Sequence, residues 1–517
     1  MGWFECRKDN DSRQHRPFTS ILLGITLVFT MAIGEQVGAS SDEEEGHGEE
    51  HGGGLFPLGD TSGVPRLPDE PIPYAVVPER PRLPVEWGCK FLGKGNIKQA
   101  TETFWGAVWT PCLLVFGTYR TALQTYQSVG PPGRIDEWRN RLDVFANLEL
   151  SQTEKCVLGA GLLDDNDFTK FSGGAFEAEN RPELEGTEYE GPYLRAFFCE
   201  GDLGSLFPKL DPQGQKHLDW GFSFGRQQIT FQEGILINDV QDGIGIVRNT
   251  LTASGVSNIR VTAWLGLANI DRGSPATIER LNEPGFFGLF SQFDTPVATW
   301  ALDLAMLRDD ENPETGRDDL TGGDGYWVGL AATQRAWSPW SGLGVVNTTY
   351  RANFSIADGP DTPQMADGTI LSAEFSWTPH DSDDVVYVNP FWADKRYTQA
   401  GREPIVGGPF APLGISFASP SLGNHLSELN SFAVPGGLFG LAVGYQAFWD
   451  NHRRNLVIEL AGTYGDEDVV LADSAALTVQ FQQAIGQHFQ LQLDGFVSSL
   501  EGRDNGSGAR VELLAQF

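Results

Sequence analysis

The feature that most constrains this sequence is the alternation of apolar and polar side chains, repeated in many segments of roughly ten residues. In NIRVTAWLGL the odd positions from Ile259 to Leu267 are apolar, whereas Asn258, Arg260 and Thr262 lie between them. Because successive side chains of a β-strand point to opposite faces, this pattern predicts strands with one apolar and one polar face. The same alternation recurs in RLDVFANLEL (141–150) and HFQLQLDGFV (488–497), and less regularly from about residue 110 onward.

Two architectures bury one face of so many strands. A soluble sandwich or barrel turns the apolar face inward, whereas a transmembrane barrel turns it to lipid and lines a wet lumen with the polar face. The polar faces carry full charges in mid-strand, which a soluble core could not hold unpaired. Trp and Tyr also gather near segment ends, as girdles at the two membrane interfaces require. These aromatic residues are Trp337, Trp340, Tyr350, Trp377, Trp392, Tyr445, Trp449 and Tyr464.

We therefore predict an all-β fold, a transmembrane antiparallel β-barrel of about 16–18 strands, spanning residues 104–517. The segment ARVELLAQF supports this prediction, because Val511, Leu513, Ala515 and Phe517 share one strand face. This aromatic-ended pattern resembles the assembly signal of bacterial outer-membrane barrel proteins, and it implies contact with the barrel-assembly machinery.

Residues 1–39 are predicted to be a secretory signal peptide. Basic Arg13 and Arg16 precede the apolar run FTSILLGITLVFTMAI, and the small residue Ala39 offers a cleavage site. The alternative is a membrane anchor, but the run of about 16 residues is shorter than the roughly 20 that span a bilayer as a helix. The predicted location is the bacterial outer membrane.

Two further segments precede the barrel. Residues 40–54 are acidic and Gly-rich, which predicts disorder because no apolar surface offsets the entropy of ordering. His47 and His51 among these carboxylates offer at most weak metal binding. Residues 55–103 contain recurrent prolines, which predicts an extended periplasmic linker or strap.

Charge and motifs exclude several classes of function. The formal net charge of −33 argues against nucleic acid as a partner. No Walker loop, G-x-S-x-G elbow, HExxH pair or Rossmann fingerprint is present, so no catalytic residue, cofactor or metal site is predicted. Four cysteines follow the signal, and their three complete pairings all remain open: Cys89, Cys112, Cys156 and Cys199.

Two stretches resemble the porin and alginate-export-like superfamily of outer-membrane barrels. They are RLDVFANLELSQTEKCVLGAGLLDD and LDWGFSFGRQQITFQEGILINDVQDGIGIVRNTL, in which Gly225, Arg226 and Gln227 end one strand and Arg248 lies on the next. Arg226 shares the parity of Trp220, so it would face the lumen only after a bulge, or where the strand has left the membrane. The resemblance implies a transport function, including export of a polysaccharide.

The predicted function is an outer-membrane channel that passes small hydrophilic solutes or ions through a charged, water-filled lumen. The alternatives are a dedicated polysaccharide or oligosaccharide transporter, and a barrel enzyme acting on lipid, for which the histidines offer little support because they lie in turn-like or strand-end positions. The expected partners are the solute, outer-membrane lipid and lipopolysaccharide. The sequence does not decide whether the chain is a monomer or a homo-oligomer. Strand parity gives the pore-lining candidates Arg248, Arg260, Asp303, Arg351, Glu374 and Glu459, and an inward-folding stretch gives the constriction-loop candidates Asp394, Lys395 and Arg396.

Overall fold

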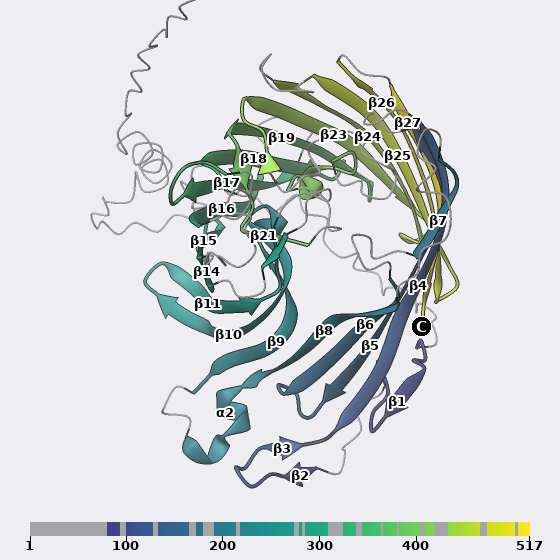
Figure 1. Cartoon of the computed structure of the whole chain (residues 1–517). Helices are drawn as coiled ribbons and strands as arrows, with labels where there is room; N and C mark the ends of the chain where they lie inside the picture. Colours follow the sequence, from purple (N-terminus) through teal and green to yellow (C-terminus); the bar gives the residue numbers. More distant parts are fainter. Residues whose placement is uncertain are drawn as a thin grey trace, which may run out of the picture. The chain divides into compact units, whose positions relative to one another are not determined.

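The computed structural model describes residues 80–93, 100–127, 133–164, 172–178, 191–213, 218–272, 279–281, 285–308, 324–337, 344–362, 365–379, 382–403, 409–417, 433–465, 473–501 and 505–517. Most of them form one antiparallel sheet that closes on itself as an 18-strand barrel (Figure 1). The fold class and the upper strand number predicted from the sequence are confirmed. The predicted signal peptide and disordered segment lie outside the described residues.

The wall strands run in chain order, and each pairs with the next. The two shorter strands β6 and β7 share one edge of β5 and fill a single position of the wall. The wall strands are β4 (Cys112–Gln127), β5 (Arg134–Glu149), β6 (Lys155–Asp164), β7 (Ser172–Ala178), β8 (Gly191–Asp202), β9 (Trp220–Phe231), β10 (Ile237–Ala253), β11 (Val256–Ala268), β14 (Gly285–Asp294), β15 (Thr299–Arg308), β16 (Gly325–Trp337), β17 (Val345–Ala357), β18 (Gly368–Trp377), β19 (Val385–Lys395), β23 (Leu438–Trp449), β24 (Arg454–Gly465), β25 (Ser474–Ile485), β26 (Phe489–Leu500) and β27 (Gly506–Gln516).

The last strand closes the barrel against the first. β27 pairs antiparallel with β4 from Ser507 opposite Gln127 to Gln516 opposite Thr118. The backbone of Phe517 exchanges two further hydrogen bonds with that of Gly117. Closure leaves no sheet edge facing lipid, where an unpaired backbone group would cost several kcal/mol.

The outer face of the wall is apolar. Leu304, Ile458, Leu460 and Val511 are each exposed, and buried polar residues alternate with them along the same strands. This outward belt matches what lipid requires of a spanning strand. No helix among the described residues is long and apolar enough to cross a membrane.

The two ends of the barrel differ in the length of their connections. At one end only 254–255 join β10 to β11, and 486–488 join β25 to β26. The opposite end carries long connections, such as 309–324 and 396–437. Bacterial outer-membrane barrels have short periplasmic turns and longer extracellular loops, which assigns the short-turn end to the periplasm.

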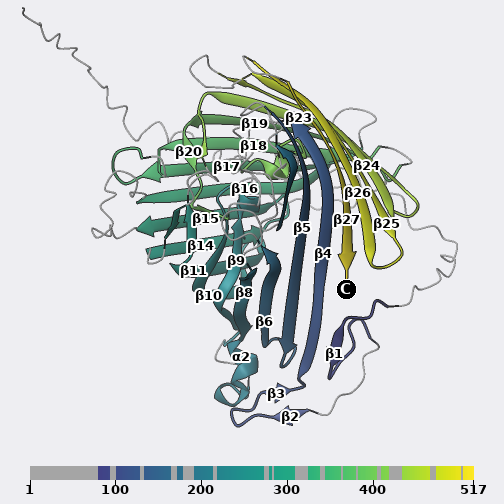
Figure 2. The same ribbon diagram turned by 45° about the vertical axis from the view of Figure 1, so that its right-hand side comes forward.

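Residues 80–93 form an N-terminal strap, which lies along one edge of the first wall strand, β4, at the periplasmic end (Figure 2). Its strand β1 (Val85–Trp87) pairs with β4, and the disulfide between Cys89 and Cys112 ties the strap to that strand. Arg80 donates a hydrogen bond of 2.8 Å to Glu86, which lowers the pKa of Glu86 to about 2. The strap lies inside the predicted linker, and the first wall strand begins later than the predicted residue 104.

The second disulfide joins neighbouring wall strands directly. Cys156 of β6 lies opposite Cys199 of β8, and a disulfide links them. No short turn fixes the register of this strand pair, because residues 165–190, which include strand β7, lie between β6 and β8 in the chain. The covalent bond therefore defines a register that would otherwise depend on side-chain packing alone.

We expect the double substitution Cys156→Ser, Cys199→Ser to lower the free energy of unfolding by as much as about 4 kcal/mol, because the bond closes a long loop in the unfolded chain. Urea titration of the refolded barrel in detergent micelles measures this. Cys89→Ser with Cys112→Ser is the control, because that bond joins the strap to β4 and leaves the register of β6 and β8 untouched. An unchanged urea midpoint for the wall variant would contradict a stabilising role for this bond.

Candidate functional site: a lumen narrowed from within

Two segments leave the wall and fold into the barrel, where the start of β10 pairs with the short strand β21 (Gly401–Arg402) (Figure 1). The first is the inner hairpin, residues 226–242, which is the end of the β9–β10 pair around the turn η4 (Gln232–Gly234). The second is the inner loop, by which we mean the described residues 396–403, 409–417 and 433–437 of the connection between β19 and β23. Because a barrel of this size encloses more space than its wall side chains fill, the inner segments determine the width of the passage.

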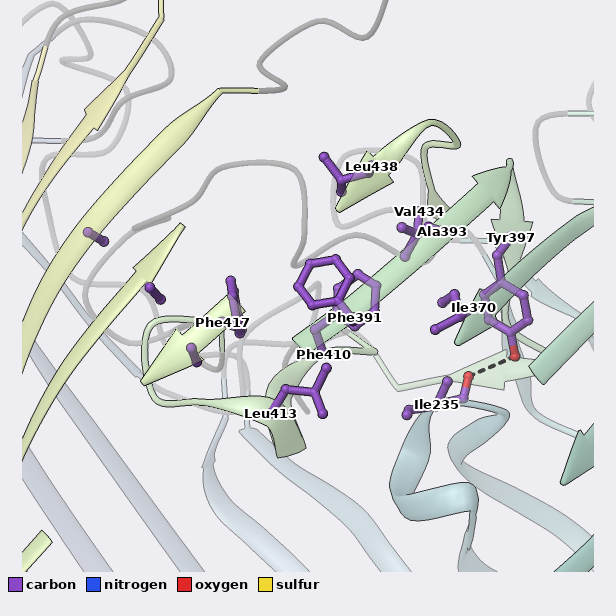
Figure 3. Close-up of a cluster of buried hydrophobic side chains, with 13 residues drawn as sticks. Ile235, Ile370, Phe391, Ala393, Tyr397, Phe410, Leu413, Phe417, Val434 and Leu438 are labelled. Carbon is purple, nitrogen blue, oxygen red and sulfur yellow. Dashed lines mark hydrogen bonds between the residues drawn. The ribbon is translucent and has the colours of Figure 1, made fainter. Parts of the chain in front are cut away.

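The inner loop carries apolar side chains into the barrel. Phe410, Leu413 and Phe417 are fully buried and pack against the wall residues Phe391 and Ala442 (Figure 3). The Phe391 and Phe410 ring centroids lie 3.9 Å apart. The barrel therefore has an interior hydrophobic core on one side of the lumen, which holds the loop in place.

A buried carboxylate fastens the same loop to the wall. Glu459 of β24 is fully buried and accepts hydrogen bonds from the backbone N–H groups of Ile415 and Ser416, at 2.8 and 2.7 Å. The Tyr387 hydroxyl also donates to it. Asn389 adds a hydrogen bond of 2.7 Å to the Leu413 carbonyl. Hydrogen bonds to a buried carboxylate are among the stronger ones in proteins, so Glu459 is an anchor for the inner loop.

The inner loop and the inner hairpin also bind each other. Ile237 and Gly401 are register partners in a short parallel pairing, and the Ala400 N–H donates to the Leu236 carbonyl at 2.9 Å. The Tyr397 hydroxyl donates to the Ile235 carbonyl at the same distance. These bonds satisfy backbone groups that no wall strand reaches, and the two segments therefore form one inner body.

The tip of the inner hairpin touches the wall on β15, β16 and β17. Gln232 donates a hydrogen bond of 2.7 Å to Asp303, and Glu233 forms an ion pair with Arg351. Gly329 lies beneath the tip, and a Cβ there would come within 2.7 Å of the Gln232 side chain. The absence of a side chain at this wall position is what lets the tip approach.

A cavity of about 540 Å³ opens beside this tip. Its walls combine charged Arg260, Asp303, Glu233 and Arg351 with aromatic side chains such as Trp300. Asp303 is buried, whereas Glu233 and Arg260 are exposed. The cavity thus offers both charge and an aromatic surface to a solute in the lumen.

Across the barrel, β27, β4, β5 and β8 carry alternating arginines and carboxylates on their inward faces, which we call the arginine strip. Arg120 and Glu512 lie 2.7 Å apart, as do Arg139 and Glu137. The carboxylates are nearly covered, with 3% and 4% of Glu512 and Glu137 exposed, against 32% for Arg120 and 26% for Arg139. The strip also contains Arg141, Asp143, Arg195 and Arg510.

The burial difference decides which charge a solute meets. Arg120, Arg139 and Arg141 are more exposed than the carboxylates they pair with, whereas Arg195 and Arg510 are buried, so the exposed part of these ion pairs is mainly cationic despite the net charge of the whole chain. The sequence already contains this pattern, since Glu137, Arg139, Arg141 and Asp143 alternate along β5. Strand parity alone would have identified these residues, but our pore-lining candidates did not include them.

Five of the predicted pore-lining residues occupy inward positions of the wall. Asp303 and Glu459 alternate with exposed apolar neighbours on the outer face, and Arg260, Arg351 and Glu374 follow the same parity rule. The structure brings Arg260, Asp303 and Arg351 together around one cavity. Their role in ion preference stays a prediction.

Arg248 requires a correction. It shares the parity of Ile244 and Ile246, whose side chains are exposed on the outer face, and it lies opposite Trp220. Its guanidinium stacks 5.4 Å from the Trp220 ring centroid and pairs with Asp219. Arg248 therefore lies on the outer face beside the periplasmic connection and does not line the pore.

The constriction-loop candidates lie at the start of the inner loop. Asp394 and Lys395 end β19 and are exposed, and Lys395 pairs with Asp367 at 3.7 Å. Arg396 donates to the Thr362 carbonyl. The segment beyond them folds inward through apolar contacts rather than through these charges. Arg226 keeps its outward parity and binds Asp242 at 2.7 Å, at the level where the inner hairpin leaves the wall.

No family model and no curated protein matches the chain. Its fold is similar to those of a BenF-like porin from Pseudomonas fluorescens Pf-5 and of OpdL from Pseudomonas aeruginosa. Each is 10% identical with a TM-score of 0.50, and each match covers 78% of this chain and 98% of the other. The likeness establishes the fold, that of bacterial outer-membrane porins, and the predicted outer-membrane β-barrel is confirmed.

Glu459→Gln tests the anchor of the inner loop. The substitution keeps the shape of the side chain but turns an amide toward N–H donors, and we expect the loop contact to weaken by about 2–3 kcal/mol. Hydrogen exchange at Ile415 and Ser416 should accelerate accordingly. Tyr387→Phe removes a single donor and should have the smaller effect. Equal exchange in wild type and Glu459→Gln would rule out an anchoring role.

Proposed function

We propose that the chain is a passive diffusion channel for small hydrophilic solutes or ions, with its narrowest passage between the inner body and the arginine strip. The porin fold supports a channel. The charged lining of the lumen supports the proposed filtering of solutes by charge. Guanidinium groups are exposed on one side, and a charged cavity opens on the other. A preformed charged passage filters solutes by local potential and needs no covalent step.

The arrangement of charge supports a preference for anions. Arg120, Arg139 and Arg141 are 22–32% exposed, whereas Glu137, Asp143 and Glu512 are 3–6% exposed. An ion in the passage therefore meets guanidinium groups before carboxylates. Each carboxylate still offsets part of the potential, so the expected preference is modest.

The lipid-enzyme alternative gains no support from the histidines that are described. His452 lies in the turn between β23 and β24, 3.9 Å from Asp383, and His488 binds the Gln516 carbonyl in the turn before β26. The other three mature histidines after residue 200, at positions 217, 380 and 425, lie outside the described residues. One of the two similar structures is described as a BenF-like porin, which supports a channel rather than a transporter of alginate.

Planar-bilayer recording of the refolded mature chain under a salt gradient tests this proposal. We expect steady open steps with a reversal potential shifted toward anions. Arg139→Gln with Arg141→Gln should move it toward cations, because the passage loses two exposed positive charges while Glu137 and Asp143 stay. Arg134→Gln is the matched control, since this arginine lies on the same strand but is 62% exposed at its far end. A folded barrel that never conducts would refute the channel.

A further inference from the structure

The tip of the inner hairpin has a backbone that is unusual for its residues. Gln232, Glu233 and Gly234 follow one another with φ of 53°, 52° and 86°. Only glycine adopts such values freely, so the backbone of the other two residues is strained. Such a conformation persists where surrounding contacts hold it, and here the tip is held by Gln232 on Asp303 and by Glu233 on Arg351.

Arg351 binds two carboxylates of different kinds. Glu374 belongs to the neighbouring wall strand, whereas Glu233 belongs to the inner hairpin. The Arg351 side chain is 3% exposed, Glu374 is 24% exposed and Glu233 is 57% exposed. Glu233 is thus the solvent-facing ligand of a buried guanidinium, and its departure would remove one of the two polar side-chain contacts described between the hairpin tip and the wall, the other being Gln232 on Asp303.

A second guanidinium faces the same space. Arg260 lines the cavity together with Arg351 and Glu233. It is exposed, and no carboxylate in the described part of the chain pairs with it. An anion entering the cavity would therefore meet the Arg260 guanidinium and the Arg351 guanidinium, of whose two carboxylate ligands Glu233 is the more exposed.

We propose that Glu233 is an internal latch: its carboxylate occupies an anion site on Arg351, and a solute anion that binds Arg351 and Arg260 displaces it. The hairpin tip then keeps its contact with Asp303 but loses the one with Arg351, and becomes more mobile. The proposal rests on the channel function proposed above and assigns a control element to that passage. Displacement exchanges one carboxylate for another ligand on the same guanidinium, so the electrostatic cost is small. Relaxation of the strained backbone at residues 232–234 favours the departure of Glu233 from Arg351.

Glu233→Gln tests the latch, with acetate as the probe anion. In wild type, potassium acetate added at constant ionic strength should raise the single-channel conductance to a plateau. It should also accelerate hydrogen exchange of the backbone amides at 233–235. The Glu233→Gln channel should conduct more than wild type without acetate, exchange faster at the tip and lose its response to acetate.

Glu374→Gln is the matched control, because it removes a carboxylate from the same guanidinium without untying the hairpin. It should keep the wild-type acetate response. The latch is refuted where acetate leaves tip exchange unchanged in wild type, or where Glu374→Gln reproduces every effect of Glu233→Gln. Hydrogen exchange requires no current, so a barrel that does not conduct refutes the channel while the latch is still tested.

Discussion

The pairing of β27 with β4 is the interaction on which the rest of the structure depends. Within lipid a sheet cannot leave an edge unpaired, so the strands must close into a ring. A ring of 18 strands encloses more volume than its inward side chains can fill. The inner body occupies part of that volume. Its buried backbone groups must also be paired, and they bind each other and inward side chains such as the Trp327 indole and the Glu459 carboxylate.

Much of the wall can be predicted from the sequence because the strand period is two. The alternation around Asp303 and Glu459 assigns both residues to the inward face, and the structure places them there. The same rule, applied to β10, would have turned Arg248 outward with Ile244 and Ile246. Our sequence-based parity therefore assigned Arg248 to the wrong face of its strand. A charge at the end of a strand can lie on the outer face where it reaches water and an aromatic ring.

The inner body could not be predicted in the same way. Its contacts join residues far apart in the chain, such as Ile235 with Tyr397 and Ile415 with Glu459, and no local period encodes them. One signal was present in the sequence: Arg226 is a charged residue at a position where strand parity predicts a side chain facing lipid. That conflict marks the level at which β9 and β10 leave the wall. Long loops of mixed composition gave the general location of the inner loop but not its apolar anchor residues.

The strap has a consequence for how the seam of the barrel is aligned. One edge of β4 is shared end to end, with β1 opposite residues 113–115 and β27 opposite residues 118–127. Sliding β27 by two residues toward the periplasm would bring it into the place of β1, which the Cys89–Cys112 bond holds. The strap therefore limits how far β27 can extend along β4 toward the periplasm. A covalent bond outside the spanning region thus defines the side-chain register inside it.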